Sequence, residues 1–391
     1  MRRNATLDAL RGYALVCIML NHIPAGWARQ FTLTNFAIYD AAELFVLLSG
    51  FLVGLVWVKV EAQSGRRAAQ WRFLRRAGQV WLALVAGGVA LALTSRGLFA
   101  LDLGHTAIWS EYARWVVELP LAYVTALAVM WMQPNLLDVL ALYVVLLAAA
   151  PVVVPLLLRW PLAFAAGSVA LWMVAGPLNA LLPNQREGNG LLFNPFAWQM
   201  LFFSGVAMGA FRHHFMPILR RHAGVLTALA AAVTLYSLGM AVLWRFGPEG
   251  KRLADAMWHA VGVVDKWSLD LVRYTAIMAA SWLVAVPLAP LMAWIAASAP
   301  GRALATIGRG GLVSFIACVL LSVVGDALGS NLSGAGTAHR AAVDLWVIAA
   351  LWLVAEVWLN RRRGPVARAC DRLPQAAEGT VRKHSFQNGL K

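Results

Sequence analysis

Long apolar runs, separated by short polar segments, follow one another along almost the whole chain. Each run holds about 18–20 residues, the length that crosses the hydrocarbon core of a bilayer as a helix. A helix satisfies its own backbone hydrogen bonds, which lipid cannot do, and the short alternating strands of a membrane barrel are not visible here. The pattern therefore predicts an all-α membrane protein with ten spans, near residues 9–28, 41–59, 77–95, 136–158, 161–182, 197–213, 223–244, 272–294, 311–330 and 341–360.

The apolar stretch 119–133 would be an eleventh span, but it is short and ends in Gln133-Pro134-Asn135. We assign residues 96–135 to a long external excursion that contains a hairpin-like, partly embedded piece. The positive charges favour this assignment, since Lys and Arg collect in cytoplasmic segments. With ten spans and both termini inside, 23 of the 33 Lys and Arg residues face the cytoplasm, and an eleventh span would move Arg361–Arg363 outside.

The composition agrees with a polytopic membrane protein. Hydrophobic residues make up 61% of the chain and charged residues only 13%, whereas a soluble domain carries roughly 25% charged residues. We expect one membrane domain over residues 1–360 and a basic, disordered cytoplasmic tail over 361–391. The net charge of +15 indicates membrane orientation and contact with anionic lipid rather than nucleic-acid binding.

Several common functional motifs do not occur in the sequence. There is no Gly-rich phosphate loop and no HExxH or other metal spacing, and the three cysteines lie far apart. The start, MRRN followed by an apolar run, has the outline of a signal peptide, but Asp8 and Arg11 interrupt the run. We therefore expect a retained first helix, no metal site and no permanently bound cofactor.

The first span, LDALRGYALVCIMLNHIP at residues 7–24, carries Asp8, Arg11, Asn21 and His22. Arg11 and His22 are eleven residues apart, so on a helix they point within roughly 20° of each other, about 16 Å apart along the axis. Exposing them to lipid would cost several kcal/mol, which predicts that they face the protein interior or a wet cavity. The alternative is that Asp8 and Arg11 snorkel at the interface while His22 bonds a neighbouring helix.

The second span, DAAELFVLLSGFLVG at residues 40–54, begins with Asp40 and Glu43. Because it returns from the side that the first span reaches, these carboxylates should lie near His22. A carboxylate on one imidazole nitrogen raises the basicity of the other, which suits a general base acting on a hydroxyl. The small residues Ser49-Gly50 and Gly54 favour close approach of another helix.

Aromatic residues accumulate in the outer segments. They form either an interfacial belt or a platform on which the faces of sugars stack, and the sequence leaves both interpretations open. The residues concerned are Trp109, Tyr112, Trp115, Trp258 and Trp267.

Several segments together resemble one enzyme family. Arg11, ten residues and His22 resemble the R-x10-H pattern of the membrane-bound acyltransferase-3 superfamily, and ELFVLLSGFLVG resembles its second-helix motif. The match is closer to the OpgC family, which modifies osmoregulated periplasmic glucans. Besides the two segments above, it extends through NFAIYDAAELFVLLSG, QPNLLDVLALYVVLL, NPFAWQMLFFSGVAMG and DKWSLDLVRYTAIMAASWL. The sequence departs from the family in having TAIM after Arg273, where a histidine is expected, and Gly308-Arg309-Gly310-Gly311 where a GRHS-like element often occurs.

The resemblance implies a multi-pass enzyme of the bacterial inner membrane that transfers an acyl group, typically succinyl, from cytoplasmic acyl-CoA to a periplasmic glucan. It implies that His22 is the catalytic histidine and Arg11 the motif arginine, while Asp8, Asp40 and Glu43 match polar positions of the family blocks. The implied partners are acyl-CoA, a glucan or polysaccharide acceptor and the bilayer.

The nucleotide of acyl-CoA is a polyanion, so we expect it to dock on cytoplasmic cations, with Arg11 and Asp8 further along the path of the pantetheine arm. The cations are Arg66, Arg67, Arg72, Arg75 and Arg76. Direct transfer with His22 as base is the favoured mechanism, and an acyl-enzyme through His22 stays open, as does a homodimer. The competing functions are a proton-coupled transporter or flippase and a catalytically silent scaffold.

Overall fold

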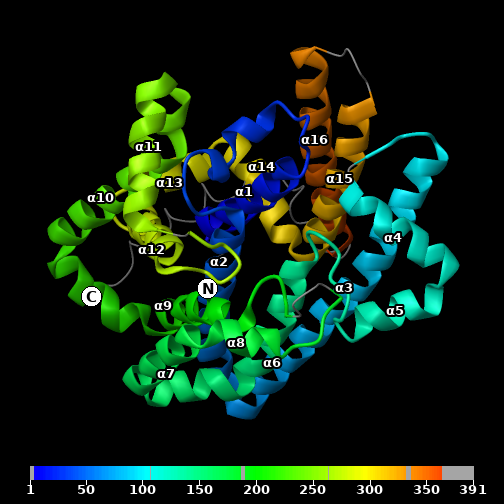
Figure 1. The fold of residues 1–391 in the computed structure, drawn as a ribbon. Coiled ribbons are helices and arrows are strands. Elements are labelled where there is room, and N and C mark those ends of the chain that lie inside the picture. Colours follow the sequence, from blue (N-terminus) through cyan, green and yellow to red (C-terminus); the bar gives the residue numbers. More distant parts are fainter. Residues whose placement is uncertain (1–3, 106, 186–189, 263, 332–335, 363–391) are drawn as a thin grey trace, which may run out of the picture.

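The computed structural model describes residues 4–105, 107–185, 190–262, 264–331 and 336–362. These residues form sixteen α-helices and three short 3₁₀ helices, without a β-strand among them (Figure 1). The basic tail predicted over 361–391 lies outside the described residues beyond Arg362, as do Arg2 and Arg3. The helices are α1 (Ala5–Asn21), η1 (Ala28–Phe31), η2 (Leu33–Asn35), α2 (Ala41–Ser64), α3 (Arg66–Ala100), α4 (Ala107–Glu118), α5 (Pro120–Ala128), α6 (Asp138–Arg159), α7 (Pro161–Met173), α8 (Ala175–Ala180), α9 (Pro195–Arg221), α10 (Ala223–Val242), η3 (Leu243–Arg245), α11 (Gly247–Val261), α12 (Leu271–Ala285), α13 (Ala289–Ala297), α14 (Ala299–Gly310), α15 (Leu312–Asn331) and α16 (Thr337–Arg362).

Helices occur at all ten positions where spans were predicted, but ten spans are not confirmed. Among the described residues, six helices are long and apolar enough to cross a membrane, or seven if the bent pair α12–α13 is one span. Those six are α2, α3, α6, α10 with η3, α15 and α16. The predicted span 9–28 is a helix of only 17 residues, and the span 161–182 is divided between α7 and α8.

The helices α2 and α6 are the most buried of the candidate membrane spans. In α2 and in α6, 61% of the most apolar 18-residue window is buried inside the protein. In the segment Ala223–Arg245 the corresponding share is only 17%. The latter segment lies at one side of the molecule with α11, and α4 and α5 lie at the opposite side, beside α3 (Figure 1). Apolar side chains on α2 and α6 therefore face protein, whereas many on α10 and α16 are left for a lipid environment.

Glycines bring α2 and α9 into backbone contact. Gly50 and Gly54 lie against the carbonyl oxygens of Phe202 and Val206, and a Cβ at either glycine would collide with that backbone. On the other helix, Gly205 lies in the same way against α2. This confirms the interpretation of Gly50 and Gly54 as close-approach residues, because small residues four apart let two helix backbones meet.

We expect Gly50→Ala to destabilise the protein by about 1–3 kcal/mol, because the added methyl group has no room against α9. The measurement is thermal unfolding of the purified protein in detergent. The matched control is Gly78→Ala in α3, where an added Cβ meets open space. Equal unfolding temperatures for the two variants would contradict the packing argument.

The excursion predicted for residues 96–135 is helical in the structure. The helix α3 continues to Ala100, and α4 and α5 fold back against it as a hairpin. Tyr123 is fully buried and donates its hydroxyl hydrogen to the carbonyl of Gly88, 2.9 Å away. Both helices of the hairpin are too short to cross a bilayer, at 12 and 9 residues.

A second irregularity is the break between α12 and α13. The two helices meet at 75°, and Pro287 lies at the break. Proline lacks the N–H that would continue the helix and its ring clashes with the preceding turn, so the bend has a local cause. At its other end α12 begins at Leu271 and is capped by Asp270, next to the polar cluster that forms the candidate site.

Candidate functional site

His22 lies just beyond the end of α1 rather than inside a longer helix. The predicted helix 9–28 stops at Asn21, and His22 is its C-terminal cap. Pro24 explains the early end, because the residue before a proline avoids the helical conformation. The helical-spacing argument for Arg11 and His22 therefore holds only up to the last turn of α1.

The His22 side chain has a defined tautomer. Its Nδ1 lies 2.7 Å from the carbonyl oxygen of Ile18. A carbonyl only accepts hydrogen bonds, so Nδ1 carries the proton and Nε2 keeps its lone pair when the ring is neutral. This is the state that a general base requires. The ring is half-buried.

The segment between His22 and Asp40 is held in place from several sides. Asn21 fixes it at its own helix, donating to Thr34 (2.8 Å) and accepting from Thr32 (2.6 Å). Three other helices bind the same segment. Asp344 of α16 accepts from the backbone N–H of Ala28 (2.7 Å), and Ser237 of α10 accepts from the backbone N–H of Ile38 (3.0 Å). Arg245 of η3 donates to the side chain of Asn35 (2.8 Å). His22 and Asp40 thus lie at the two ends of an anchored loop.

Asp40 and Glu43 form the N-terminal cap of α2. The Asp40 side chain accepts from the backbone of Ala42 at 2.7 Å, and Glu43 Oε2 accepts from the backbone of Asp40 at 3.0 Å. This reciprocal capping box satisfies N–H groups that the first turn of a helix cannot pair internally. It also fixes both carboxylates at the N-terminal end of α2.

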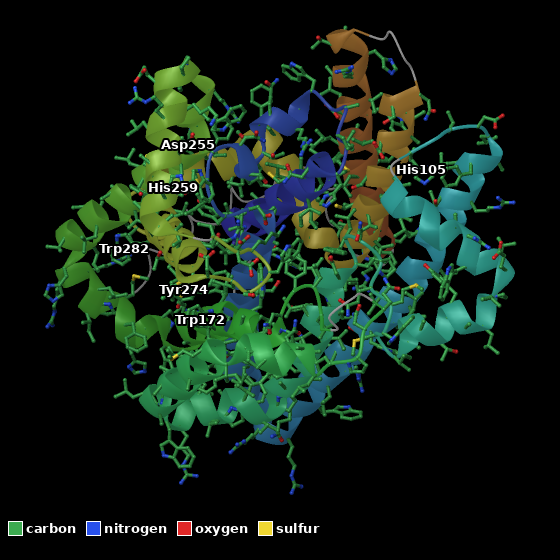
Figure 2. The ribbon with its side chains drawn as sticks, in the orientation of Figure 1. His105, Trp172, Asp255, His259, Tyr274 and Trp282 are labelled. Carbon is green, nitrogen blue, oxygen red and sulfur yellow. The ribbon has the colours of Figure 1, made fainter. Side chains whose placement is uncertain are left out.

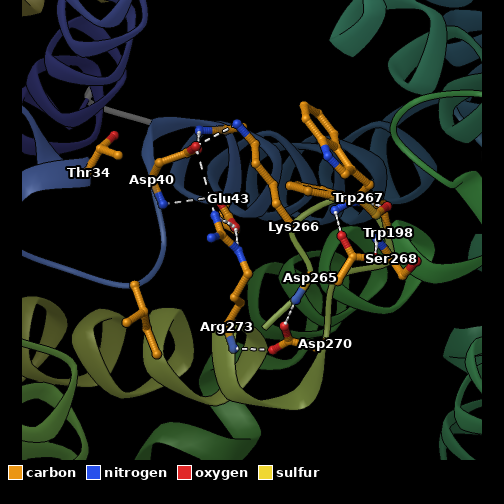
Figure 3. A network of polar contacts seen from close by, with 12 residues as sticks. Thr34, Asp40, Glu43, Trp198, Asp265, Lys266, Trp267, Ser268, Asp270 and Arg273 are labelled. Carbon is orange, nitrogen blue, oxygen red and sulfur yellow. Dashed lines mark hydrogen bonds and ion pairs between the residues drawn. The ribbon is translucent and has the colours of Figure 1, made fainter. Parts of the chain in front are cut away.

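Two cations bind these carboxylates (Figure 3). Lys266 Nζ lies 2.6 Å from Asp40 Oδ2. Arg273 grips Glu43 Oε1 with two nitrogens, Nε at 2.6 Å and Nη2, and its Nη2 is also 3.8 Å from Asp40. The prediction that a carboxylate of Asp40 or Glu43 binds one imidazole nitrogen of His22 is corrected here, because Nδ1 binds the Ile18 carbonyl and the two carboxylates bind Lys266 and Arg273.

A tight turn positions the two cations. Asp265 accepts from the backbone of Trp267 (2.9 Å) and Ser268 (3.1 Å), while Asp270 accepts from the backbone of Asp265 and caps α12 through Arg273 N at 2.8 Å. The turn is tied to its surroundings as well, since Trp172 donates to the carbonyl of Leu269 at 2.9 Å. Figure 2 labels Trp172 and also Tyr274, whose hydroxyl is 2.8 Å from that of Ser204.

The side chains of Asp40 and Lys266 are both ionised. Burial alone would raise the pKa of the Asp40 carboxyl, but the positive charges of Lys266 and Arg273 hold it well below its usual range. Burial alone would lower the pKa of Lys266, but the negative charges of Asp40 and Glu43 raise it above its ordinary value. Asp40 and Lys266 therefore form an ion pair at neutral pH.

The other predicted residues lie away from this cluster. Asp8 and Arg11 are half-buried in the first turns of α1, where α1 packs on α14 through Gly12 and Gly308. The predicted nucleotide-binding arginines lie on the first turns of α3, at the end of the α2–α3 hairpin opposite Asp40. Of these, Arg66, Arg67, Arg72 and Arg75 are exposed and Arg76 is half-buried.

The outer aromatic residues divide into two groups. Trp115, Trp258 and Trp267 are 37%, 38% and 41% exposed. The side chains of Trp109 and Tyr112 lie outside the described residues. Trp267 alone of the three adjoins the charged cluster, since Lys266 Nζ lies 5.1 Å from its ring centroid.

Lys266 and Arg273 are the site residues that the sequence argument missed. The signal was present in DKWSLDLVR, residues 265–273, where four charged residues immediately precede an apolar span. Charged groups at such a position need partners, but the sequence does not show which carboxylates supply them. Across the described parts of the chain, no three His, Cys, Asp or Glu side chains are placed to hold a metal ion.

Comparisons with known proteins bear on the chain as a whole. Neither the curated proteins nor the solved structures contain a match to it. A family model described as OpgC protein matches residues 3–363, which is nearly the whole chain and includes α1, the capped α2 and the turn that carries Lys266 and Arg273. The chain belongs to the OpgC family.

Proposed function

We propose that the protein is an O-acyltransferase of the bacterial inner membrane. It moves an acyl group, with succinyl the first candidate, from cytoplasmic acyl-CoA to a hydroxyl of a periplasmic glucan or related polysaccharide. The observation that carries the proposal, beside the family match, is the His22 imidazole with Nδ1 on the Ile18 carbonyl and Nε2 available as a base.

The chemistry needs a base, a leaving group and charge stabilisation. His22 Nε2 takes the proton of the acceptor hydroxyl as the hydroxyl oxygen attacks the thioester carbonyl. The C–S bond then breaks, and CoA leaves as the thiol with the proton that His22 Nε2 donates to its sulfur. The tetrahedral intermediate carries an oxyanion, which a positive group or an amide near His22 stabilises. In the alternative route His22 itself becomes acylated before the sugar enters.

The donor would bind along the path from α3 to α1. The phosphates of CoA dock on the arginines of α3, since guanidinium groups bind phosphate by paired hydrogen bonds. The pantetheine arm then passes Asp8 and Arg11 towards His22. The helix α2, 24 residues or about 36 Å long, separates the arginine end from the Asp40 end, so donor and acceptor enter from opposite sides.

We expect replacement of Arg66, Arg67, Arg72, Arg75 and Arg76 by glutamine to raise the KM for acyl-CoA roughly tenfold with little change in kcat. The magnitude follows because each exposed charge contributes little alone, whereas five contribute together. The measurement is initial rate against acyl-CoA concentration at two salt concentrations. The control is Arg220→Gln with Arg221→Gln, two exposed cations on α9. An unchanged KM would place the nucleotide elsewhere.

The reaction itself is tested with purified protein in liposomes. Acyl-CoA and a glucan are supplied, free CoA is titrated, and the glucan is weighed by mass spectrometry. Parallel reactions with succinyl-CoA and acetyl-CoA identify the preferred donor. Acylated glucan together with stoichiometric free CoA supports the proposal, and no CoA release with any donor overturns it.

A transport function is the second candidate, and one observation favours it. The broken helix α12–α13 carries Arg273 in its first turn, paired with the buried Glu43, and transporters use both broken helices and buried ionisable residues. A proton-coupled carrier or flippase would move a sugar or lipid-linked substrate across the liposome membrane without consuming acyl-CoA. Substrate uptake in the absence of a donor would favour it over the transferase.

A further inference from the structure

The four-charge cluster has an inner half and an outer half. The side chains of Glu43 and Arg273 are 0% and 11% exposed, so this pair is structural. The side chains of Asp40 and Lys266 are 13% and 29% exposed. Lys266 has the most exposed side chain of the four, so Lys266 and its partner Asp40, the outer pair, form the part of the cluster that a ligand can reach.

An exposed indole borders the outer pair on a rigid backbone. The backbone N–H of Trp267 donates to the Asp265 side chain. The backbone carbonyl of Trp267 accepts from Trp198 Nε1 at 3.0 Å and from the backbone N–H of Asn194 at 3.2 Å. Its ring makes an edge contact with Phe193 at 5.3 Å. A large apolar ring that is fixed in place yet 41% exposed is ready to bind a ligand at little cost in conformational entropy.

The combination of groups selects the chemistry of the ligand. Carboxylate oxygens accept hydrogen bonds and the Lys266 ammonium donates three, of which Asp40 takes one. The adjacent indole offers a flat apolar face. A pyranose unit presents complementary groups, since its hydroxyls both donate and accept and its C–H face is apolar.

The charge balance argues against an anionic ligand at this position. Lys266 is already neutralised by Asp40, and Asp265 and Asp270 add negative charge to the same turn. A free carboxylate, such as the end of a succinyl group, would have to displace Asp40. A neutral polyol gains hydrogen bonds from both partners without breaking the pair.

We propose that Asp40, Lys266 and Trp267 form the acceptor subsite, which binds a neutral pyranose unit of the glucan. This inference rests on the proposed function. The subsite lies at the Asp40 end of the anchored loop whose other end carries His22. The subsite determines the acceptor, whereas the α3 arginines determine the donor.

Binding is tested first without any donor, so that the result does not depend on catalysis. Wild-type protein, Trp267→Ala, Trp267→Phe and Lys266→Met are titrated calorimetrically with a linear neutral glucose oligomer and, separately, with succinate. We expect the oligomer to bind the wild type and Trp267→Phe, and to bind Trp267→Ala and Lys266→Met at least about tenfold more weakly. Trp294→Ala, which removes a 71% exposed indole on α13, is the control and should bind as the wild type does.

The kinetic readout separates the subsite from a merely structural role. In Trp267→Ala the KM for the glucan should rise about tenfold while the KM for acyl-CoA and the unfolding temperature stay unchanged. Tighter binding of succinate than of the oligomer, or a rise in the donor KM alone, would overturn the proposal. If sugar binds at this subsite but no donor releases CoA, the proposed function fails and the subsite stands.

Discussion

Replacing His22 by alanine is expected to reduce acyl transfer by a factor of about 10²–10⁴, the usual contribution of a positioned general base. Nδ1 of the imidazole donates to the Ile18 carbonyl, so Nε2 can accept a proton from the hydroxyl. Removing it leaves the hydroxyl without a proton acceptor. Free CoA and acylated glucan, measured in the liposome reaction, should both fall together.

The fold should survive this change, because His22 is a half-buried cap at the end of α1 rather than a core residue. His22→Gln is the sharper variant, since glutamine retains hydrogen bonding but has no basic nitrogen. His259→Ala, an exposed histidine of α11, is the control (Figure 2). Wild-type rates in a folded His22→Gln protein would exclude the base mechanism.

The same protein separates direct transfer from an acyl-enzyme. Wild-type protein is mixed with acyl-CoA without acceptor, and its intact mass is measured after rapid quenching. Direct transfer predicts an unmodified mass. A mass increase by one acyl group that is lost in His22→Gln would establish the covalent route.

Breaking the buried pair Glu43–Arg273 should destabilise the protein by about 3–5 kcal/mol, because it leaves one charge buried and unpaired. The Glu43 side chain is 0% exposed. It accepts the capping hydrogen bond at the start of α2 and pairs with Arg273 of α12. We expect Glu43→Ala and Arg273→Ala to unfold at clearly lower temperatures than the wild type.

The double variant Glu43→Leu with Arg273→Met is the critical comparison. It removes both charges and restores apolar volume, so it should be more stable than either single variant. The surface pair Glu249–Arg252, whose side chains are 83% and 79% exposed, supplies the control, and Glu249→Ala should leave unfolding unchanged. If the single and double variants were equally destabilised, the coupling of α2 to α12 would be absent.

Local features of the sequence predicted local features of the structure. The apolar runs gave helices at all ten predicted positions, and the GxxxG spacing of Gly50 and Gly54 gave the close contact with α9. Where the local signal was mixed, the prediction was less complete. Pro24 ends α1 before His22, and the excursion 96–135 continues as the end of α3 and a helical hairpin.

The sequence by itself determined the helical, membrane-associated class of the protein, the helix positions and the OpgC resemblance, because these depend on composition and on residues near one another in the chain. The role of His22 as the base stays a prediction. The partners of the carboxylates were decided only by the tertiary structure. Glu43 and Arg273 are 230 residues apart, and in the structure Lys266 and Arg273, rather than His22, pair with Asp40 and Glu43. Helical periodicity shows which way a side chain points, but only the packing of α2 against the start of α12 determines which charge it meets.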